Sequence, residues 1–586
     1  MKPTPKGLLA AGVVVAAGLW VYGPALHGGW LWDDTMYFGE NPLMLLRASA
    51  AWRSIWSGTA DISYFPLTAL ARWAEWHLWG ENTLGYHLTN LGLHLLSALL
   101  FWRLLRQLRE EAGAGAAPGA EWLGALLFVV HPVAVESVAW ISELKNTLSL
   151  PPLLLSFSAF LAFDRAPAGR AGPYLRSLLW FLIALLCKST VVMLPACLLL
   201  HAWWKRGRIG RRDLAASAPF FALAFVLGLV TVWFEHHAVL DYRMVPVESL
   251  WTRVSGAGVA LVFYLGKAIF PAGVAPIYPQ WRLLAGEPIL AGLALALLVG
   301  WLLLRGTRGA RHALFGLGWF VLNLAPMVGL VGLAYLRISR VADHFAYLAL
   351  LGVIGWGTLA FDRWRRQGGR VRQGLIWLGA AAAATALAVE ARACARSFKN
   401  ERVFWTETLR RNPDAWLAHY DLGNVFLADG NLPEALRHFE EAARLNPRQS
   451  EPQSNWGVAL VMLGRSADAV PHLEEAVRLD PENALQQNSL GMALVNTRQF
   501  EAALVHYQRA IALDPTLSEA HNNLGRVLSQ LGRLDEAIAQ FQEAVRLRPQ
   551  NAVMRRNLAQ ALSQAGRLDE ALDQYAQASR LEHPNP

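Results

Sequence analysis

Cysteine is scarce in this chain of 586 residues, and charge is thinly spread over its first two-thirds. The three cysteines, Cys187, Cys197 and Cys394, all fall within apolar segments. Cysteines in such surroundings are usually small buried hydrophobes, so a disulfide framework or a cysteine-bound metal is not expected. Charged residues make up 17% of the chain and are denser in the alanine-rich remainder that begins near Arg396. This split predicts a membrane domain followed by a soluble domain.

Several familiar catalytic signatures are also missing. The sequence contains no HExxH zinc motif, no Walker phosphate loop and no GxSxG nucleophile elbow. Their absence argues against a zinc protease, an ATPase of the P-loop type and a serine hydrolase.

Twelve apolar segments are candidates for membrane helices, since a crossing needs about 20 mostly apolar residues. The first resembles a signal peptide but continues to Trp20 and Tyr22, so we interpret it as an uncleaved span. The segments are 7–23, 85–102, 121–139, 146–163, 174–187, 190–204, 214–234, 251–270, 287–304, 312–331, 344–361 and 374–394.

Basic connections fix the predicted orientation, because lysine and arginine favour the cytoplasmic side of a membrane. Such connections occur at 103–111, 164–176, 205–212, 305–311 and 362–372. They leave 251–270 without a net crossing, so we expect it to be re-entrant or to lie in protein near the outer surface. The prediction is eleven crossings in a cell (inner) membrane, with a cytoplasmic N-terminus and the C-terminal domain outside. These loops also account for the net charge of +9 without nucleic-acid binding.

The last third of the chain is a repeat with a period of 34 residues. Prolines recur at 413, 447, 481, 515 and 549, and alanines at 435, 469, 503, 537 and 571. This spacing is the tetratricopeptide signature and predicts an α-solenoid of five helix pairs. The expected domains are 1–395, a multispan membrane domain, 396–413, a connecting helix, and 414–586, the solenoid.

Polar residues recur in register on the first helix of each repeat, the helix that lines the concave face of such a solenoid. One interpretation is a solvated ridge; the other is a row of groups that hydrogen-bond an acceptor polypeptide without reading its sequence. These residues are Asp421, Asn455, Ser489, Asn523 and Asn557.

Ionisable residues cluster in the segments predicted to lie outside. Asp33 and Asp34 follow the first span, and His131, Glu136 and Lys145 belong to one later segment. Helix capping would explain the aspartates singly. Ionisable groups at a membrane edge are costly, however, and are usually paired or functional.

Such a set could transfer a group from a lipid phosphate at the membrane surface. Asp33 or Asp34 could take the proton of an attacking hydroxyl, with Glu136 and His131 orienting groups or linked to a metal. Lys145, Lys188 or Arg340, with His131, could hold the departing phosphate. A divalent cation such as Mg²⁺ or Mn²⁺ on Asp33 and Asp34 is the alternative, and no cofactor is certain.

The order of these motifs resembles the TMTC family of transmembrane, tetratricopeptide-repeat O-mannosyltransferases and its bacterial relatives. The matching residues are "WDD…ENP" (32–34, 40–42), "FPLT" (65–68), "GYHLTNLGLHLLSALLFWRLLR" (85–106), "HPVAVESVAWISELKN" (131–146), "CKST" (187–190) and "RVADHFAYL" (340–348). Two positions depart from the pattern: Leu144 stands where relatives often have arginine, and His344 follows the "AD" pair.

The resemblance implies an all-α membrane fold of the GT-C type with an outward-facing site. It also implies that an acidic residue of the first outer loop is the base or metal partner, which corresponds to Asp33 and Asp34. The implied donor is a polyprenyl-phosphate sugar such as mannose, and the implied acceptors are serine or threonine hydroxyls of exported proteins. Two alternatives stay open: an acceptor that is a glycolipid or envelope polymer, and a non-catalytic membrane scaffold.

Overall fold

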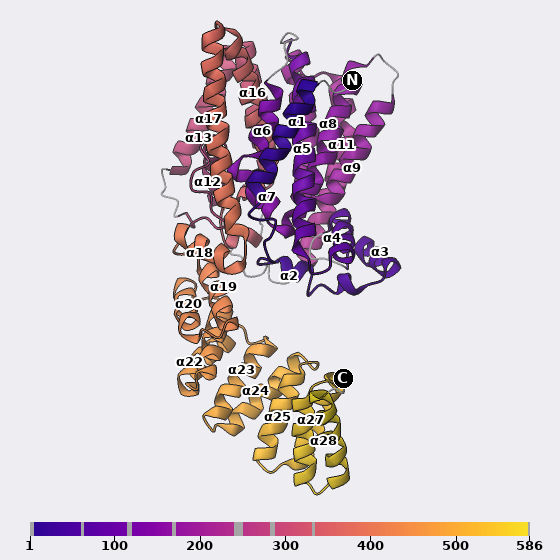
Figure 1. Ribbon diagram of the computed structural model, residues 1–586, viewed down its shortest axis with the longest axis vertical. Helices are drawn as coiled ribbons and strands as arrows, with labels where there is room; N and C mark the ends of the chain where they lie inside the picture. Colours follow the sequence, from indigo (N-terminus) through magenta and orange to yellow (C-terminus); the bar gives the residue numbers. More distant parts are fainter. Residues whose placement is uncertain are drawn as a thin grey trace. The chain divides into compact units, whose positions relative to one another are not determined.

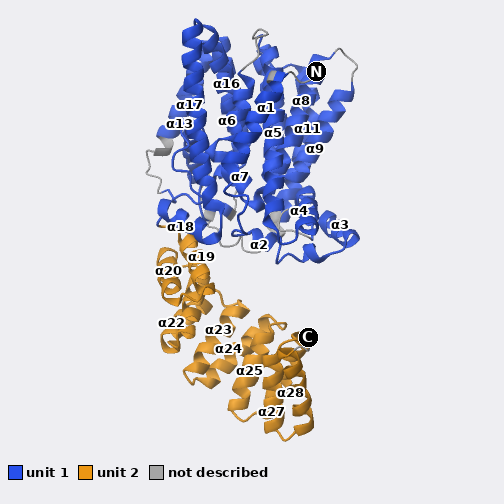
Figure 2. Cartoon of the chain, in the orientation of Figure 1, with its two compact units in different colours: residues 1–413 blue, residues 414–586 orange. Residues whose placement is uncertain are grey.

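The computed structural model describes residues 5–59, 64–113, 120–166, 171–238, 250–281, 287–330 and 334–583. Throughout these ranges the regular structure is helical and no strand occurs. The chain divides into two compact units, Met1–Pro413 and Asp414–Pro586, called unit 1 and unit 2 (Figure 2). The all-α architecture predicted from the sequence is therefore confirmed.

Unit 1 is a bundle of long helices joined by short ones (Figure 1). The helices of the bundle are α1 (Pro5–Tyr22), α5 (Thr83–Glu111), α6 (Glu121–Val129), α8 (Leu144–Arg165), α9 (Ala171–Cys187), α10 (Leu194–Arg206), α11 (Arg211–Ala238), α12 (Leu250–Ile269), α13 (Glu287–Arg305), α14 (Arg308–Leu324), α16 (Leu350–Arg366) and α17 (Arg370–Ala395), of which α6 is only nine residues long. The short ones are α2 (Asp34–Tyr37), η1 (Pro42–Leu45), α3 (Ala48–Ser57), α4 (Pro66–Trp79), η2 (Pro132–Ala134), α7 (Val135–Ala139), η3 (Ile141–Glu143), η4 (Ser189–Met193), η6 (Ala334–Arg337), α15 (Asp343–Ala346), η7 (Arg396–Phe398) and α18 (Glu401–Arg411).

Several of these helices are suited to a bilayer. Four described segments are long and apolar enough to cross, Thr83–Glu111, Ile141–Arg165, Arg211–Phe234 and Arg370–Phe398, and a bent pair forms a fifth candidate. Shorter apolar helices cover Gly7–Tyr22, Ala171–Cys187 and Leu290–Arg305. Unit 1 is thus a polytopic membrane domain, and the count of eleven crossings stays a prediction.

The candidate span over 121–139 is bent rather than one continuous helix. Its helix stops at Val129, and the chain bends by 55° before α7. Pro132 begins the short helix η2, because proline lacks the backbone N–H that a continuing helix would need. His131 caps η2 through its Nδ1, which accepts the N–H of Val133 at 3.3 Å.

Residues 250–269 form one unbroken helix, α12, rather than an interrupted re-entrant segment. Near its start, Arg253 donates to the carbonyl of Gly329 at 3.4 Å, and further along, the Tyr264 hydroxyl donates to the carbonyl of Ala342 at 3.1 Å. Both partners belong to the connection between α14 and α16. One connection therefore contacts both halves of α12, and whether this helix makes a net crossing stays a prediction.

The connections of unit 1 gather at two opposite ends (Figure 1). One end, called the acidic end, holds residues 24–59, 64–84 and 131–145 with α18. The other, called the basic end, holds residues 205–211, 305–311 and 362–372. Gly207 and Gly309, from two connections of the basic end, lie close to the guanidinium groups of Arg311 and Arg363.

Unit 2 consists of five helix pairs. They are α19 (Trp416–Ala428) with α20 (Leu432–Leu445), α21 (Ser450–Met462) with α22 (Ser466–Leu479), α23 (Ala484–Asn496) with α24 (Phe500–Leu513), α25 (Ser518–Gln530) with α26 (Leu534–Leu547), and α27 (Ala552–Gln564) with α28 (Leu568–Glu582). The predicted five tetratricopeptide repeats are confirmed.

A glycine on the first helix of each of the first four pairs lets a bulky side chain of the second helix pack against the backbone. A Cβ at Gly423 would lie 2.6 Å from Phe439, and one at Gly491 would lie 2.7 Å from Tyr507. Gly457 and Gly525 repeat the arrangement with Leu473 and Phe541. The alanines predicted at the helix crossings, Ala435, Ala469, Ala503 and Ala537, have no exposed surface.

The turn within each pair needs a left-handed residue. Gly430, Gly464, Gly532 and Gly566 occupy it with φ between 74° and 77°. Arg498 holds the same place in the third pair with φ 62°, a conformation that favours glycine.

Candidate active site

Asp33 and Asp34 lie together at the acidic end, but their surroundings differ. Asp34 is fully buried, and its two oxygens accept the backbone N–H groups of Leu31 at 2.9 Å and Ser142 at 2.8 Å. Asp33 is partly exposed, and its Oδ1 accepts the hydroxyl of Ser142 at 2.8 Å. Asp34 is thus held by backbone N–H groups on both oxygens, whereas only one oxygen of Asp33 accepts a hydrogen bond from the described residues.

Burial raises the pKa of both aspartates. For Asp33 the positive charges of Lys145 and Arg72 and the Ser142 hydrogen bond act in the opposite direction, and desolvation exceeds them. For Asp34 the pKa is raised well above its ordinary value by burial and by the neighbouring charge of Asp33. A carboxylate with a raised pKa is the stronger proton acceptor once ionised.

Trp32 ties this acidic pair to two other segments. Its indole stacks on that of Trp140, with ring centroids 5.2 Å apart and an interplanar angle of 10°. The edge of this indole meets Trp405 of α18 at 5.3 Å, and the backbone N–H of Trp32 donates to Oε1 of Glu401 at 3.2 Å. Trp32 itself has φ 50°, an unusual value for a bulky residue that only firm surroundings maintain.

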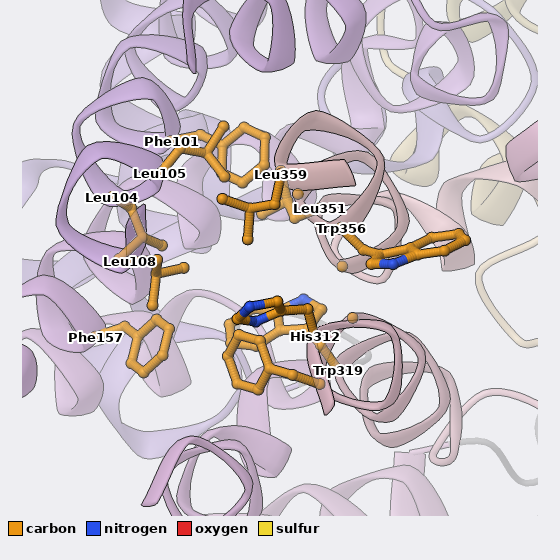
Figure 3. Close-up of a pocket in the computed structure, with 14 residues that line it drawn as sticks. Phe101, Leu104, Leu105, Leu108, Phe157, His312, Trp319, Leu351, Trp356 and Leu359 are labelled. Carbon is orange, nitrogen blue, oxygen red and sulfur yellow. The ribbon is translucent and has the colours of Figure 1, made fainter. Parts of the chain in front are cut away.

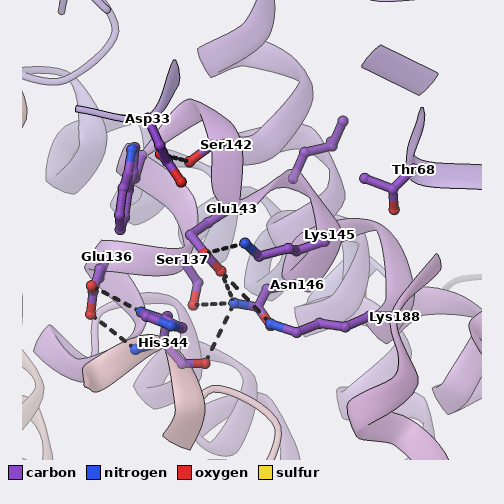
Figure 4. Close-up of polar contacts among 12 residues, drawn as sticks. Asp33, Thr68, Glu136, Ser137, Ser142, Glu143, Lys145, Asn146, Lys188 and His344 are labelled. Atoms are coloured by element: carbon purple, nitrogen blue, oxygen red, sulfur yellow. Dashed lines mark hydrogen bonds and ion pairs between the residues drawn. The ribbon is translucent and has the colours of Figure 1, made fainter. Parts of the chain in front are cut away.

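Glu143 is the centre of a buried ionic network beside the pair (Figure 4). Its Oε1 lies 2.9 Å from the ammonium of Lys145, and its Oε2 lies 3.8 Å from that of Lys188. Asn146 links the two sides, because its amide donates to Glu143 while its oxygen accepts from Lys188 at 2.6 Å. The sequence analysis missed Glu143, although it lies in the quoted segment "ISELKN".

Arg72 is a second residue that the sequence analysis missed. This buried arginine of α4 lies over the ring of Tyr37, with its guanidinium carbon 3.9 Å from the ring centroid, and it donates to the carbonyl of Ser142 at 3.4 Å. The ammonium of Lys145 approaches the same ring at 5.9 Å. Two cations from separate helices thus converge near Asp33.

Lys188 is positioned by the break between α9 and η4. The hydroxyl of Thr68, from the "FPLT" segment, donates to the carbonyl of Cys187 at 2.8 Å and so holds the end of α9. The next residue, Lys188, is then directed toward Asn146 and Glu143 (Figure 4).

Glu136 and His131, the other predicted members, hold the fold around the site. Glu136 accepts the backbone N–H of His344 at 3.0 Å and contacts its Nδ1 at 2.9 Å, which fastens α7 to the start of α15. Both ring nitrogens of His131 are used, by Val133 and by the carbonyl of Ala268. The amide of Asn146 donates to the carbonyl of His344 at 3.4 Å. Glu136 is therefore linked to the network of Glu143 indirectly, through His344 and Asn146.

Arg340 lies half-buried three residues before Asp343. Asp343, which the sequence analysis did not select, is buried, and both its oxygens accept the hydroxyl of Tyr278 at 3.0 Å. These residues lie in the same connection that contacts α12.

In unit 2 the predicted row of polar groups is half-buried. The amide of Asn523 donates to Asn488 at 3.1 Å, that of Asn557 donates to Asn522 at 2.8 Å, and that of Asn455 donates to Asn424 at 2.8 Å. Each bond joins neighbouring repeats. Asp421 occupies the corresponding place in the first repeat.

The fit of a divalent cation can be judged from the oxygens. Asp34 directs both its oxygens at N–H groups, whereas no hydrogen bond reaches Oδ2 of Asp33 from any described residue. Across the described ranges no three His, Cys, Asp or Glu side chains are grouped to share an ion. An ion here would take one oxygen from Asp33 and its other ligands from phosphate and water.

Curated proteins similar to this chain carry one activity in their names. Protein O-mannosyl-transferase F38B6.6 of Caenorhabditis elegans is 30% identical over 166 residues, which cover 26% of this chain and 24% of that protein. Protein O-mannosyl-transferase TMTC1 of Mus musculus is 27% identical over 187 residues, 30% of this chain and 19% of that protein. Protein O-mannosyl-transferase Tmtc3 of Drosophila melanogaster is 22% identical over 471 residues, 65% of this chain and 48% of that protein.

The chain thus spans less than half the length of these relatives. The resemblance to TMTC proteins that its motifs predicted is confirmed, and the chain is TMTC-like.

Family profiles match only the second half of the chain. Two described as tetratricopeptide repeat match residues 402–450 and 516–581, and one described as TPR repeat matches 499–532. Among solved structures, MamA is 26% identical with a TM-score of 0.26, covering 28% of this chain and 95% of that chain. YrrB, titled a TPR protein with an unusual peptide-binding site, is 25% identical with a TM-score of 0.27, covering 31% of this chain and 93% of that chain.

Proposed function

We propose that this chain is a membrane glycosyltransferase that moves a mannose-like hexose from a polyprenyl-phosphate donor to serine or threonine hydroxyls of exported proteins. The observation that carries the proposal is the carboxylate of the partly exposed Asp33, which lies beside Lys145 and Arg72 and has one oxygen without a hydrogen bond from any described residue. An available base next to cations is what transfer from a sugar phosphate to a hydroxyl requires. The names of the curated relatives support the same chemistry.

Asp33 is the proposed base, and Asp34 is its support. As the acceptor oxygen forms a bond to the anomeric carbon of the sugar, Asp33 takes the hydroxyl proton. The bond between that carbon and the phosphate oxygen breaks, and its electron pair leaves with the polyprenyl phosphate. Asp34 cannot easily share this role, because both its oxygens hold the loop to Ser142 and Leu31.

The leaving phosphate needs cations that stay in place as charge develops on it. Lys145 and Arg72 both lie over the ring of Tyr37, near Asp33. They are the proposed contacts of the leaving phosphate. Glu143 holds Lys145 in position, and Lys188 pairs with the other oxygen of the same carboxylate. The proposed phosphate set omits His131, whose ring nitrogens are used within the protein, and keeps Arg340 as a further candidate.

A divalent cation such as Mg²⁺ or Mn²⁺ would be held by Oδ2 of Asp33. When bound, such an ion neutralises the phosphate charge and so assists its departure. In that case Asp33 would orient the donor, and the hydroxyl proton would leave through water.

We propose that residues 1–395 perform the transfer, residues 396–413 connect, and residues 414–586 present the acceptor. In this proposal Asp421, Asn455, Asn523 and Asn557 hydrogen-bond the acceptor backbone. The row of half-buried amides, which repeats from one pair to the next, supports it.

The same proposal places the acidic end on the outer side of a cell (inner) membrane and the basic end on the cytoplasmic side. The gathering of the arginine-rich connections at one end supports this orientation.

Reconstitution tests the function directly. The full chain in liposomes is supplied with polyprenyl-phosphate mannose and a serine- and threonine-rich unfolded protein, and hexose addition is followed by mass spectrometry. We expect transfer by the unaltered chain and by Glu81→Gln, an exposed acid of the same end, but not by Asp33→Asn. Labelling of lipid alone would favour a glycolipid acceptor, and equal transfer by Asp33→Asn would refute the proposed base.

A further inference from the structure

The middle of the unit 1 bundle is closely packed. A pocket between α5, α8, α14 and α16 has almost entirely apolar walls and a volume of only about 40 Å³, far too small for a sugar or a lipid chain (Figure 3). Close-packed helices of this kind deform little, so they form a firm frame behind the acidic end. The direction of the Asp33 carboxylate therefore depends on the contacts of its own loop, residues 28–34.

The segment formed by η7 and α18 runs beside this loop. The N–H of Gly29 donates to the carbonyl of Lys399 at 3.0 Å, which joins the two backbones. The next contact is made by a side chain, because Oε1 of Glu401 accepts the backbone N–H of Trp32 at 3.2 Å. Glu401 thus holds the residue that directly precedes Asp33.

Trp32 needs this support. Its φ of 50° lies in the left-handed region, which is unfavourable for a bulky residue and is kept only by surrounding contacts. Without an acceptor for its N–H, residue 32 could return to a negative φ. Since Asp33 is the next residue, its carboxylate would then turn away from the Ser142 hydroxyl that it now accepts.

The start of α18 is fixed, so Glu401 cannot follow a loop that moves. Oδ1 of Asn400 caps this helix by accepting the N–H of Val403 at 2.9 Å, and Glu401 is its first residue and partly buried. At 3.2 Å the bond from Trp32 is at the long end of the usual range. A side chain shorter by one carbon, about 1.5 Å, would not reach it.

We propose that Glu401 is a positioning residue for the transfer site, which holds Asp33 in place through the backbone of Trp32. The inference rests on the proposed function, in which Asp33 is the base. Glu401 acts here as a hydrogen-bond acceptor, and its negative charge is not required. Aspartate at this position keeps the charge but is too short, whereas glutamine lacks the charge but keeps an oxygen at the same reach.

Hydrogen–deuterium exchange of the full chain in liposomes measures the loop directly. Glu401→Asp and Glu401→Gln are compared with the unaltered chain and with Glu407→Gln, a control on the same helix whose native glutamate pairs with Arg410 at 2.8 Å. We expect exchange within residues 28–37 to be about fivefold or more faster in Glu401→Asp, and unchanged in the other two variants.

Transfer kinetics of the same proteins measure the consequence for the base. Glu401→Asp should lower kcat about tenfold or more while KM for the donor stays within about twofold, because a misdirected base weakens the transition state rather than binding. Glu401→Gln and Glu407→Gln should keep the kcat of the unaltered chain. Should Glu401→Asp not purify, Glu401→Leu, which has no acceptor, takes its place in both measurements.

Unaltered exchange in Glu401→Asp, or faster exchange with an unaltered kcat, would overturn the inference. A loss of kcat in Glu401→Gln as large as in Glu401→Asp would also overturn it, in favour of a requirement for the charge. If the unaltered chain transfers no sugar, the proposed function fails, and the exchange comparison then decides alone whether Glu401 holds the loop.

Discussion

The hydroxyl of Ser142 lies 2.8 Å from Oδ1 of Asp33, and with the bond from the Ser142 N–H to Asp34 it joins the loop after the first helix to the segment that carries Glu143 and Lys145. It holds Asp33 from one side only. The carboxylate is therefore oriented without being fully occupied, as a proton acceptor must be.

Asp33 and Asp34 should respond differently to the same substitution. Asp33→Asn can still accept the Ser142 hydroxyl, so we expect little change in thermal stability but a loss of transfer of at least about 10²-fold. Asp34→Asn would place an NH₂ against a backbone N–H, which should cost about 1–3 kcal/mol of unfolding free energy. Thermal unfolding and initial transfer rates of the two purified variants check this. Similar stability losses in both would contradict the assignment.

Transfer should be lost as the pH falls, because only ionised Asp33 accepts a proton. Burial raises the pKa of Asp33, and the charge of Lys145 lowers it, so Lys145→Gln should raise that pKa further. The acid limb of kcat/KM against pH would then move to higher pH. Lys399→Gln, an exposed lysine of the same end, serves as the control and should leave the limb in place. A limb that moves to lower pH would exclude Asp33 as the titrating base.

Glu143→Gln should destabilise unit 1 strongly. It removes the carboxylate that pairs with the buried ammonium of Lys188 and the half-buried ammonium of Lys145, a change that typically costs about 3–5 kcal/mol. Lys145→Met in the same chain should restore part of the loss, with a coupling of about 1 kcal/mol or more. Denaturation of the single and double variants gives that coupling, and purely additive effects would refute a direct pair.

The Asn523→Ala and Asn557→Ala double variant should raise KM for an unfolded protein acceptor severalfold while kcat stays near its original value. A short peptide that cannot span the repeats should be unaffected. Ser489→Ala is the matched control, because the Ser489 hydroxyl bonds Leu485 of its own helix at 2.9 Å. If the double variant instead lowers only the unfolding temperature, the amides serve the bonds to Asn488 and Asn522 and no acceptor role follows.

Arg498→Gly should stabilise the solenoid. Glycine removes the strain of the left-handed conformation, but it also gives the unfolded chain more conformational freedom, which opposes folding. The net gain in unfolding free energy should therefore be about 1 kcal/mol or less. Gly464→Arg introduces the same strain into the second pair and should destabilise by a similar amount. Urea unfolding of residues 414–586 measures both, and a destabilised Arg498→Gly would show that the arginine side chain contributes contacts of its own.

The repeats could be predicted almost completely from the sequence, because each obeys local rules. Small residues where helices cross and a turn glycine recur every 34 residues, and Arg498 is visible as the exception. The bend near Pro132 was not predicted, although the proline signalled it. The residues on both sides of the break are apolar, so an average of hydropathy over a window does not detect the break.

The ionic network could be predicted only in part. Lys145 and Lys188 were selected, but Glu143, which holds both, was not. Two residues apart on a regular helix, Glu143 and Lys145 would face different directions. They meet because η3 ends and α8 begins between them, a local break that spacing alone does not reveal. Arg72 reaches the site from another helix, which requires knowledge of tertiary contacts.

The contact of α18 with Trp32 lies within unit 1, so the surroundings of the acidic pair and the number of repeats can change separately in evolution. The helix beside the acidic pair belongs to unit 1, while the repeated helices begin only after Pro413. Repeats stack on their neighbours alone, so pairs can be duplicated or deleted without disturbing any contact of Trp32. Under the proposed function, the number of repeats, and with it the length of acceptor polypeptide that the solenoid binds, can then change without changing the transfer site.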